Sequence, residues 1–357
     1  MEKYDVVIVG AGPAGLACAK ELSKGNNSVL IIEKNKVIGP KVCAGGLTEK
    51  SVEILKKEWK LNSKGMFKLL PMKKYRDILF KSDQKTILIS SKKHTVCVID
   101  RGYFGNFLLH QIDKKKVRIL KGLRVKNITN SYVELSDERK IGYNFLVGAD
   151  GSNSLVREYL GIKSEVDITL QYKIKKSNLI RSKKKFRYLE VHSNTKLFGS
   201  WYAWIFPYKD YVSVGCGSNP KIMPPARLRQ NFSTWLKSEG IDVLDSQLES
   251  FPISCKYLGW RFDKVFLCGD ACGLASGMSG EGIYQALVSG SEIAKVILEK
   301  DYEPKLLFEI IEKNKKAYMI AKFFGKHRLL FCLAKNFTLS LVGFKLVRRY
   351  MKKKLLS

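Results

Sequence analysis

The sequence predicts an α/β protein whose parallel-sheet domain is interrupted by a β-rich antiparallel domain and followed by a helical segment. The first observation is a strand, turn, helix, strand unit at the start of the chain. The second is a set of short apolar runs far apart in the sequence, which is typical of the buried strands of a parallel sheet. The third is the alternation of apolar and polar residues between them, which is typical of antiparallel strands with one solvated face.

The first unit begins with residues 4–9, a β-branched apolar run that predicts a buried strand. A glycine-rich turn follows, and an Ala- and Leu-rich pattern then predicts a helix to Leu22. Residues 28–33 (SVLIIE) predict a second buried strand. Further runs of the same kind occur at 117–120, 145–149 and 265–268. We therefore expect one parallel sheet that collects strands from distant parts of the chain.

The alternating stretches define the expected division into domains. The β-rich domain, which we expect to bind the substrate, comprises residues 66–98 and 166–256. The parallel-sheet domain is discontinuous, with a helix expected at 280–299. It comprises residues 1–65, 99–165 and 257–300. Residues 301–357 are expected to form a basic, amphipathic C-terminal helical region.

The charge balance is strongly basic. Lys and Arg number 64 against 33 Asp and Glu among 357 residues, a net charge of +31. This excess predicts attraction to a polyanion: nucleic acid, an anionic membrane surface or acidic substrates. Residues 313–357 carry ten Lys and three Arg without any acidic residue, interleaved with apolar residues. Either an interfacial helix pair that binds anionic lipid headgroups or a packed helical cap with a solvated basic face would have this composition.

Cysteine and histidine usage argues against a metal centre. The eight cysteines form no C-x-x-C pair and histidine occurs four times, so we expect neither a zinc site nor a disulfide framework. No stretch reaches about 18 uninterrupted apolar residues, the length that a spanning helix needs. The first residues also lack a signal-peptide cleavage pattern. We expect a cytoplasmic protein, with any contact to the inner face of the cell membrane being peripheral.

The segment GAGPAG, from Gly10 to Gly15, matches G-x-G-x-x-G directly between a strand and a helix. Gly10 permits a tight turn, Gly12 lets the backbone approach a pyrophosphate, and Gly15 lets the helix pack on the strand. The free N–H groups at the helix start would attract phosphates. Glu33, at the end of the next strand, would accept the ribose hydroxyls of an adenosine. The pattern predicts a Rossmann-like dinucleotide site but does not separate NAD from FAD.

Two later segments, 148–152 (GADGS) and 265–271 (VFLCGDA), resemble FAD-dependent oxidoreductases with the aromatic-hydroxylase type of fold. The resemblance implies that Asp270 binds the ribityl chain of FAD. It also implies that the glycine-rich helix start at 279–283 faces the flavin and stabilises its anionic reduced form. No second G-x-G-x-x-G unit occurs, so the reductant, NAD(P)H or a reduced ferredoxin-type carrier, would bind transiently. An acidic electron-donor protein would suit the basic surface.

Residues 41–46 (KVCAGG) resemble a cysteine- and glycine-containing loop that follows the second strand in one family of that superfamily, the geranylgeranyl reductases. Residues 202–207 (YAWIFP), followed after seven residues by GCG, match its Y-x-W-x-F-P-x7-G-x-G pattern. Residues 100–104 (DRGYF) and 280–287 (GEGIYQAL) resemble two further family segments. The resemblance implies FAD contacts from Ala14, Glu33, Cys43, Ala44, Gly46, Arg101, the backbone of Val125, Asp270, Gly280, Gly282 and Ile283.

Members of that family saturate isolated double bonds of polyprenyl chains, so the resemblance implies an FAD-dependent reductase with a prenyl lipid substrate. Hydride from flavin N5 to one alkene carbon requires a proton for the other carbon. Cys43 or Tyr202 could deliver it. Tyr202, Trp204 and Phe206 share one face of a strand by their period of two and, with Gly215, could line the substrate site.

Two alternatives stay open: a flavin monooxygenase or halogenase of the same fold, and a non-catalytic flavoprotein electron relay. Monooxygenase chemistry would use oxygen at the reduced flavin instead of transferring hydride to an alkene. Nucleic acid is not expected as a partner, because no basic-aromatic recognition module accompanies the charge.

Overall fold

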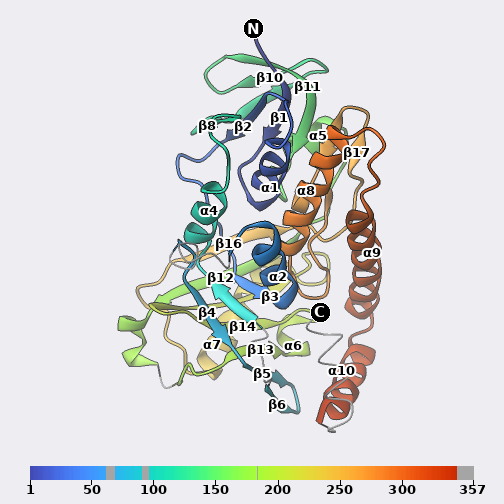
Figure 1. Cartoon of the computed structure of the whole chain (residues 1–357). Coiled ribbons are helices and arrows are strands. Elements are labelled where there is room, and N and C mark those ends of the chain that lie inside the picture. Colours follow the sequence, from blue (N-terminus) through green and yellow to red (C-terminus); the bar gives the residue numbers. More distant parts are fainter. Residues whose placement is uncertain (62–68, 91–95, 183, 344–357) are drawn as a thin grey trace.

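The computed structural model describes residues 1–61, 69–90, 96–182 and 184–343. Its first sheet is mainly parallel and lies at the N-terminal end of the molecule in Figure 1. The spatial order of its main path is β17 (Arg261–Phe262), β18 (Val265–Leu267), β11 (Lys140–Gly148), β1 (Glu2–Val9), β2 (Val29–Glu33), β8 (Val117–Lys121). β9 (Val125–Ile128) and β10 (Tyr132–Leu135) extend it as an antiparallel meander from β11.

The predicted collection of distant strands into one parallel sheet is confirmed. β1 pairs in parallel with both β2 and β11, β2 pairs with β8, and β11 pairs with β18. All five residues of β2 are buried, as a central strand covered on both faces requires. The fold class expected from the apolar runs is therefore the one observed.

Helices α1 (Pro13–Leu22) and α8 (Ile283–Leu298) pack against each other beside this sheet. Gly290 allows the close approach, since a Cβ atom placed there would lie 2.1 Å from the carbonyl oxygen of Ala14. The helix predicted from residue 280 begins at Ile283, because Gly280 has a φ of +67°, outside the helical region. Shorter helical elements complete this part of the chain: α4 (Arg101–Leu109), α5 (Leu155–Tyr159) and η2 (Gly269–Cys272).

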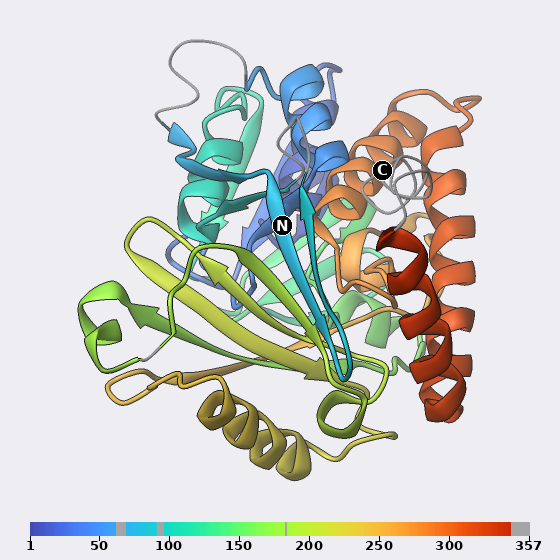
Figure 2. The same cartoon turned by 90° about the horizontal axis from the view of Figure 1, so that it is seen from below.

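The second sheet has seven strands and is antiparallel except where β13 runs parallel to β5. Its order is β16 (Leu248–Ile253), β12 (Asp167–Lys175), β15 (Tyr211–Ser218), β14 (Ala203–Pro207), β13 (Leu189–Ser193), β5 (Asp77–Ser82), β6 (Thr86–Ser90). Helix α7 (Pro225–Ser238) packs on one side of this sheet (Figure 2). The connections contain η1 (Lys176–Arg181) and α6 (Thr195–Phe198).

The alternating pattern predicted one solvated face for these strands, and this prediction is wrong for the central ones. Every residue of β14 is buried, and β15 is buried after its first residue. One face of these strands packs on α7 and the other lines a cavity. The alternating residues therefore point to two buried environments, not to core and solvent. Polar residues such as Glu190 and His192 are buried because other charged groups surround them.

A small third sheet lies between the two large ones. β3 (Gly46–Thr48) and β4 (Met72–Tyr75) both pair with β7 (Val96–Ile99). β3 comes from a segment assigned to the parallel-sheet domain, whereas β4 and β7 begin in the segment assigned to the β-rich domain. The third sheet thus joins residues from both predicted domains, and helix α2 (Glu49–Glu58) follows β3 directly.

The chain continues into two helices, α9 (Lys305–Lys326) and α10 (Arg328–Gly343), along one side of the molecule (Figures 1 and 2). They fall in the region predicted to be helical, basic and amphipathic. Residues 344–357 of that region lie outside the described residues. Across the described ranges, no helix combines the length and hydropathy required to span a membrane.

Candidate active site

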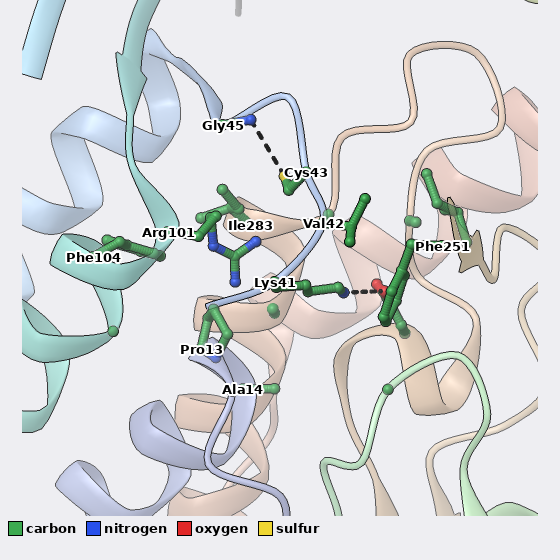
Figure 3. A pocket seen from close by; sticks show the side chains of 18 of the residues that line it. Pro13, Ala14, Lys41, Val42, Cys43, Gly45, Arg101, Phe104, Phe251 and Ile283 are labelled. Atoms are coloured by element: carbon green, nitrogen blue, oxygen red, sulfur yellow. Dashed lines mark hydrogen bonds and ion pairs between the residues drawn. The ribbon is translucent and has the colours of Figure 1, made fainter. Parts of the chain in front are cut away.

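A cavity of about 800 Å³ extends from the carboxyl end of the parallel sheet to the inner face of the seven-stranded sheet. Ligands of open α/β sheets bind at that end of the strands. The glycine turn after β1, the loop before β3, the start of α4 and the loop before α8 all contribute to the walls. Figure 3 shows how side chains from these separate segments surround the same space.

The dinucleotide fingerprint lies at one end of the cavity. Gly10, Gly12 and Ala14 line the cavity, whereas Gly15 does not. Gly15 packs against the turn instead, since a Cβ there would lie 2.0 Å from the Gly10 carbonyl oxygen. Gly15 therefore serves the packing of helix on strand, as its position in the pattern predicts. The Glu33 carboxylate accepts the N–H groups of Ala11 and Asn35, each at 2.8 Å, and still faces the cavity. Its remaining lone pairs are free for ribose hydroxyls.

Two helix N-termini end at the cavity without side-chain caps. Gly12 is the N-cap of α1 and Gly282 the N-cap of α8, and neither helix start receives a capping hydrogen bond from a side chain. Their free N–H groups and positive dipole ends favour a bound anion. The space beside Gly12 is open, with no atom within 4 Å of an added Cβ. A diphosphate-containing cofactor such as FAD fits these donors.

Arg101 lies at the start of α4 and faces the cavity beside Cys43 (Figure 3). Its side chain is 6% exposed, and its Nε has no hydrogen-bond partner among the described residues. A buried unpaired donor of this kind is costly unless a ligand or water satisfies it. Because Arg101 lines the cavity, a bound cofactor could satisfy this donor, and Arg101 fits the predicted role of a cofactor contact.

Cys43 is held in the loop before β3, where its Sγ accepts the Gly45 N–H at 3.3 Å. Burial alone would raise the pKa of this thiol. The guanidinium of Arg101, the Gly45 N–H and the ammonium of Lys41 outweigh burial, so the pKa of Cys43 is lowered. A thiol with a lowered pKa releases its proton more readily.

Tyr202 lies just before β14, and its hydroxyl donates a hydrogen bond to the carbonyl oxygen of Ser279. Burial raises the pKa of this phenol well above its usual value. The hydrogen bond and the burial both keep the phenol of Tyr202 protonated. Of the two proton donors expected from the sequence, Cys43 therefore has the more suitable environment.

Asp270 faces the cavity from η2 and carries an ion pair that the sequence did not predict. The Nζ of Lys41 lies 3.1 Å from its Oδ2 (Figure 3). The Ser152 hydroxyl donates to the same oxygen at 3.2 Å. The same ammonium lies 4.6 Å from the centre of the Phe251 ring. Lys41 belongs to the cysteine-containing loop, but its partner is far away in the sequence, so no local pattern identified it.

The loop before α8 brings Gly280, Gly282 and Ile283 to the cavity, as expected. Glu281, which was not predicted as a site residue, also lines it. Its Oε1 accepts hydrogen bonds from Thr48 at 2.6 Å and from Ser51 at 3.2 Å. These bonds fix the loop to the β3–α2 segment. Ala44, Gly46 and Val125 complete the predicted cofactor residues that line the cavity.

The other end of the cavity is apolar. Trp204 and Phe206 project into it from β14, and Tyr202 lines it from the preceding position. Gly215 does not line the cavity. A Cβ there would lie 2.2 Å from the Trp204 ring, so Gly215 makes room for the indole and affects the substrate space indirectly. The neighbouring strands add Ile78, Phe80, Leu189 and Val191 to the apolar wall.

A second charged cluster lies on the other side of β13. Ligand atoms of Glu190, His192 and Glu239 lie within 4.8 Å of one another, a spacing compatible with metal binding. However, the Nζ of Lys184 lies 3.0 Å from Glu190 and 2.7 Å from Glu239, and Lys81 lies 3.0 Å from Glu239. Two ammonium groups thus already neutralise both carboxylates. Burial would raise the pKa of Glu239, but His192 and the lysines outweigh it and hold that pKa well below its usual range.

The parallel sheet, the glycine turn and the uncapped helix starts define a dinucleotide-binding protein. The family described as "FAD binding domain" matches residues 3–299. The chain therefore belongs to this family of FAD-dependent oxidoreductases, as the sequence predicted.

Known proteins extend this assignment. A digeranylgeranylglycerophospholipid reductase of Methanocaldococcus jannaschii is 27% identical, with 88% of this chain and 83% of that protein covered. A geranylgeranyl diphosphate reductase of Rhodobacter capsulatus is 25% identical, with 83% and 75% covered. The crystal structure of a geranylgeranyl bacteriochlorophyll reductase-like protein from Thermoplasma acidophilum has a TM-score of 0.74 at 21% identity and covers 91% and 88% of the chains. Geranylgeranyl reductases are thus among the homologues of this chain.

Proposed function

We propose that the chain is an FAD-dependent reductase that saturates isolated double bonds of a geranylgeranyl-type chain on a lipid or lipid-like substrate. The observation that carries the proposal is the continuity of the cavity. Its dinucleotide end at Gly10 and Glu33 opens past Cys43 onto the apolar surface of Trp204 and Phe206. An apolar chain on that surface would lie in the same enclosed space as the cofactor. The names of the homologues support the same substrate class.

FAD, once bound and reduced, supplies a hydride to one carbon of the alkene. In this proposal Cys43 gives the proton on its Sγ to the other carbon and regains a proton from solvent. The guanidinium of Arg101 stabilises the thiolate left behind, for the same reason that it lowers the pKa of the thiol. Trp204 and Phe206 hold the apolar chain and exclude water.

The starts of α1 and α8 provide positive potential for the negative charges of the cofactor. The uncapped start of α1 suits the diphosphate of the cofactor, and the uncapped start of α8 suits an anionic flavin. Glu281 positions the α8 loop through its bonds to Thr48 and Ser51.

The electron donor in this proposal binds transiently and is NAD(P)H or a reduced ferredoxin-type protein. The net charge of +31 would attract an acidic carrier protein. Rates of flavin reduction by each donor, followed by stopped flow at low and high salt, distinguish the two classes. A steep fall with ionic strength supports a protein donor.

The function itself is tested without a physiological donor. The FAD-loaded protein is reduced chemically in the absence of oxygen and mixed with geranylgeranyl lipids and prenyl diphosphates, while flavin absorbance and product mass are followed. We expect flavin reoxidation and a gain of about two mass units per double bond, the stoichiometry of hydride plus proton addition. Flavin that stays reduced with every prenyl compound and reoxidises only with oxygen would favour a monooxygenase or an electron relay.

A further inference from the structure

Helix α10 turns apolar side chains toward solvent. Leu329, Leu333 and Phe337 follow one another at every fourth residue and are 83%, 68% and 67% exposed. Residues with this spacing share one helix face, so they form a continuous apolar strip. The last part of α9 exposes further apolar side chains. We name the whole set the apolar ridge; it consists of Met319, Ile320, Phe323, Leu329, Leu330, Leu333 and Phe337.

Two polar side chains of α10 point inward and bond to the β-rich domain. Lys335 forms an ion pair with Asp83 at 2.8 Å and donates to the Ser193 carbonyl oxygen at 2.9 Å. Asn336 donates to the side chain of Gln84 at 3.0 Å, on the turn between β5 and β6. A surface helix of a water-soluble protein normally faces its core with apolar residues and the solvent with polar ones. In α10 the most exposed side chains are apolar while Lys335 and Asn336 face inward, which indicates that the apolar ridge meets an apolar partner.

Basic residues accompany the apolar ridge. Lys316, Lys322, Lys326 and Arg328 are exposed, and within the described part of the chain they form no ion pair at 4.0 Å or less. The sequence of 344–357 adds four Lys and two Arg without an acidic residue. This charge is complementary to an anionic bilayer, and it repels a second copy of the same basic chain.

The apolar ridge also adjoins the rim of the cavity. Gly277 lies against α9, where an added Cβ would be 3.2 Å from the Cα of Tyr318. Met278 follows and is 46% exposed, and the next residue, Ser279, lines the cavity and accepts the hydrogen bond of Tyr202. The loop that touches α9 next to Met319 is therefore the loop that closes one side of the cavity.

We propose that the apolar ridge and its basic residues dock the protein on an anionic lipid bilayer, with the rim at Met278–Gly280 turned toward the membrane. Apolar side chains would enter the interface while Lys and Arg contact the headgroups, as in interfacial amphipathic helices. Docking itself needs no catalytic activity. The claim that it brings a membrane-borne substrate to the cavity rests on the proposed function.

The test is co-sedimentation of the full-length, FAD-loaded protein with phosphatidylglycerol-containing vesicles, compared with pure phosphatidylcholine vesicles. A variant with Leu329→Glu, Leu333→Glu and Phe337→Glu should bind at least about tenfold more weakly, since three interfacial side chains lose their apolar contact. The side chains are exposed, so the fold should persist, which circular dichroism and FAD content verify. The control is Leu244→Glu, because Leu244 is also largely exposed, at 64%, but lies outside the ridge. It should bind like the parent protein.

Several outcomes would overturn docking: no binding of the parent protein to anionic vesicles, equal binding by the triple variant, or dimerisation through the ridge in the absence of lipid. Measurements of prenyl reduction distinguish the docking proposal from the reductase proposal. The triple variant should reduce detergent-solubilised substrate normally and vesicle-borne substrate poorly. If no prenyl substrate is reduced by any form while vesicle binding still depends on the ridge, the reductase proposal fails and docking stands.

Discussion

Gly290→Ala should disturb the cofactor site from a position outside it. The added Cβ would lie 2.1 Å from the Ala14 carbonyl oxygen, and Cβ contacts are ordinary only from about 3.4 Å, so α1 and α8 must separate by about 1.3 Å. The obstructing atoms belong to the backbone and cannot rotate away. Overpacking of this kind costs up to about 3 kcal/mol. Replacing a mid-helix glycine by alanine returns about 1 kcal/mol, so we expect a net loss of about 2 kcal/mol.

The same displacement should weaken FAD binding, because both helices present their uncapped N-termini to the cavity. Loss of most of one helix-dipole interaction, about 1–2 kcal/mol, corresponds to roughly tenfold weaker binding. Urea unfolding of the apoprotein gives the stability, and a fluorescence titration with FAD gives the affinity. Gly325→Ala is the matched control, since its added Cβ would be too close only to the movable end of the Ile222 side chain, at 2.5 Å, and the next atom, the Ser200 Oγ, lies at an ordinary 3.6 Å. Parent-like stability and FAD affinity in Gly290→Ala would refute this account of the packing.

Further predictions concern the cavity and the buried charges. Cys43→Ala and Cys43→Ser should each lower prenyl turnover by about 100-fold; full activity in both excludes proton donation by this thiol. Arg101→Met removes the strongest of the groups that oppose burial and should raise the pKa of Cys43, so the pH profile of its alkylation in the apoprotein should move to higher pH; an unchanged profile contradicts the assigned electrostatics. Gly215→Val should push the Trp204 ring into the apolar end of the cavity, raising KM for prenyl substrates while FAD affinity stays constant. Glu239 has a lowered folded-state pKa, so its contribution to stability is present above an unfolded pKa of about 4.3 and is lost as the pH falls through the folded value. Glu239→Gln should therefore flatten the acid limb of a stability-versus-pH curve; an identical limb would exclude this group.

Local sequence patterns were sufficient for the parallel sheet and the cofactor turn. The run at 4–9 and the glycines from Gly10 to Gly15 specify strand, turn and helix through short-range sterics. Consecutive residues are therefore enough to predict this geometry. The period of two in β14 similarly placed Trp204 and Phe206 on the same face. The cavity walls that follow these patterns are the ones observed.

Interactions between distant segments were beyond the same reasoning. Lys41 and Asp270 are 229 positions apart, and Thr48 and Glu281 are 233 apart. Their pairing depends on how β3 and the α8 loop meet in space. Alternation in the β-rich region was also misinterpreted, because polar residues can alternate toward a buried ion-pair network as well as toward water. For α10 the amphipathic period was visible, but which of its faces points inward was not.

The discontinuous order of the parallel sheet has a consequence for synthesis on the ribosome. β1 and β2 emerge first, yet β11 must emerge before β1 has its second neighbour, and β18 and α8 come later still. Such non-local pairing delays folding until distant segments are available. The cofactor site can therefore close only when residues 283–298 have left the exit tunnel. α9 and α10 leave the tunnel after that point, so the FAD site can close before the apolar ridge has emerged from the ribosome.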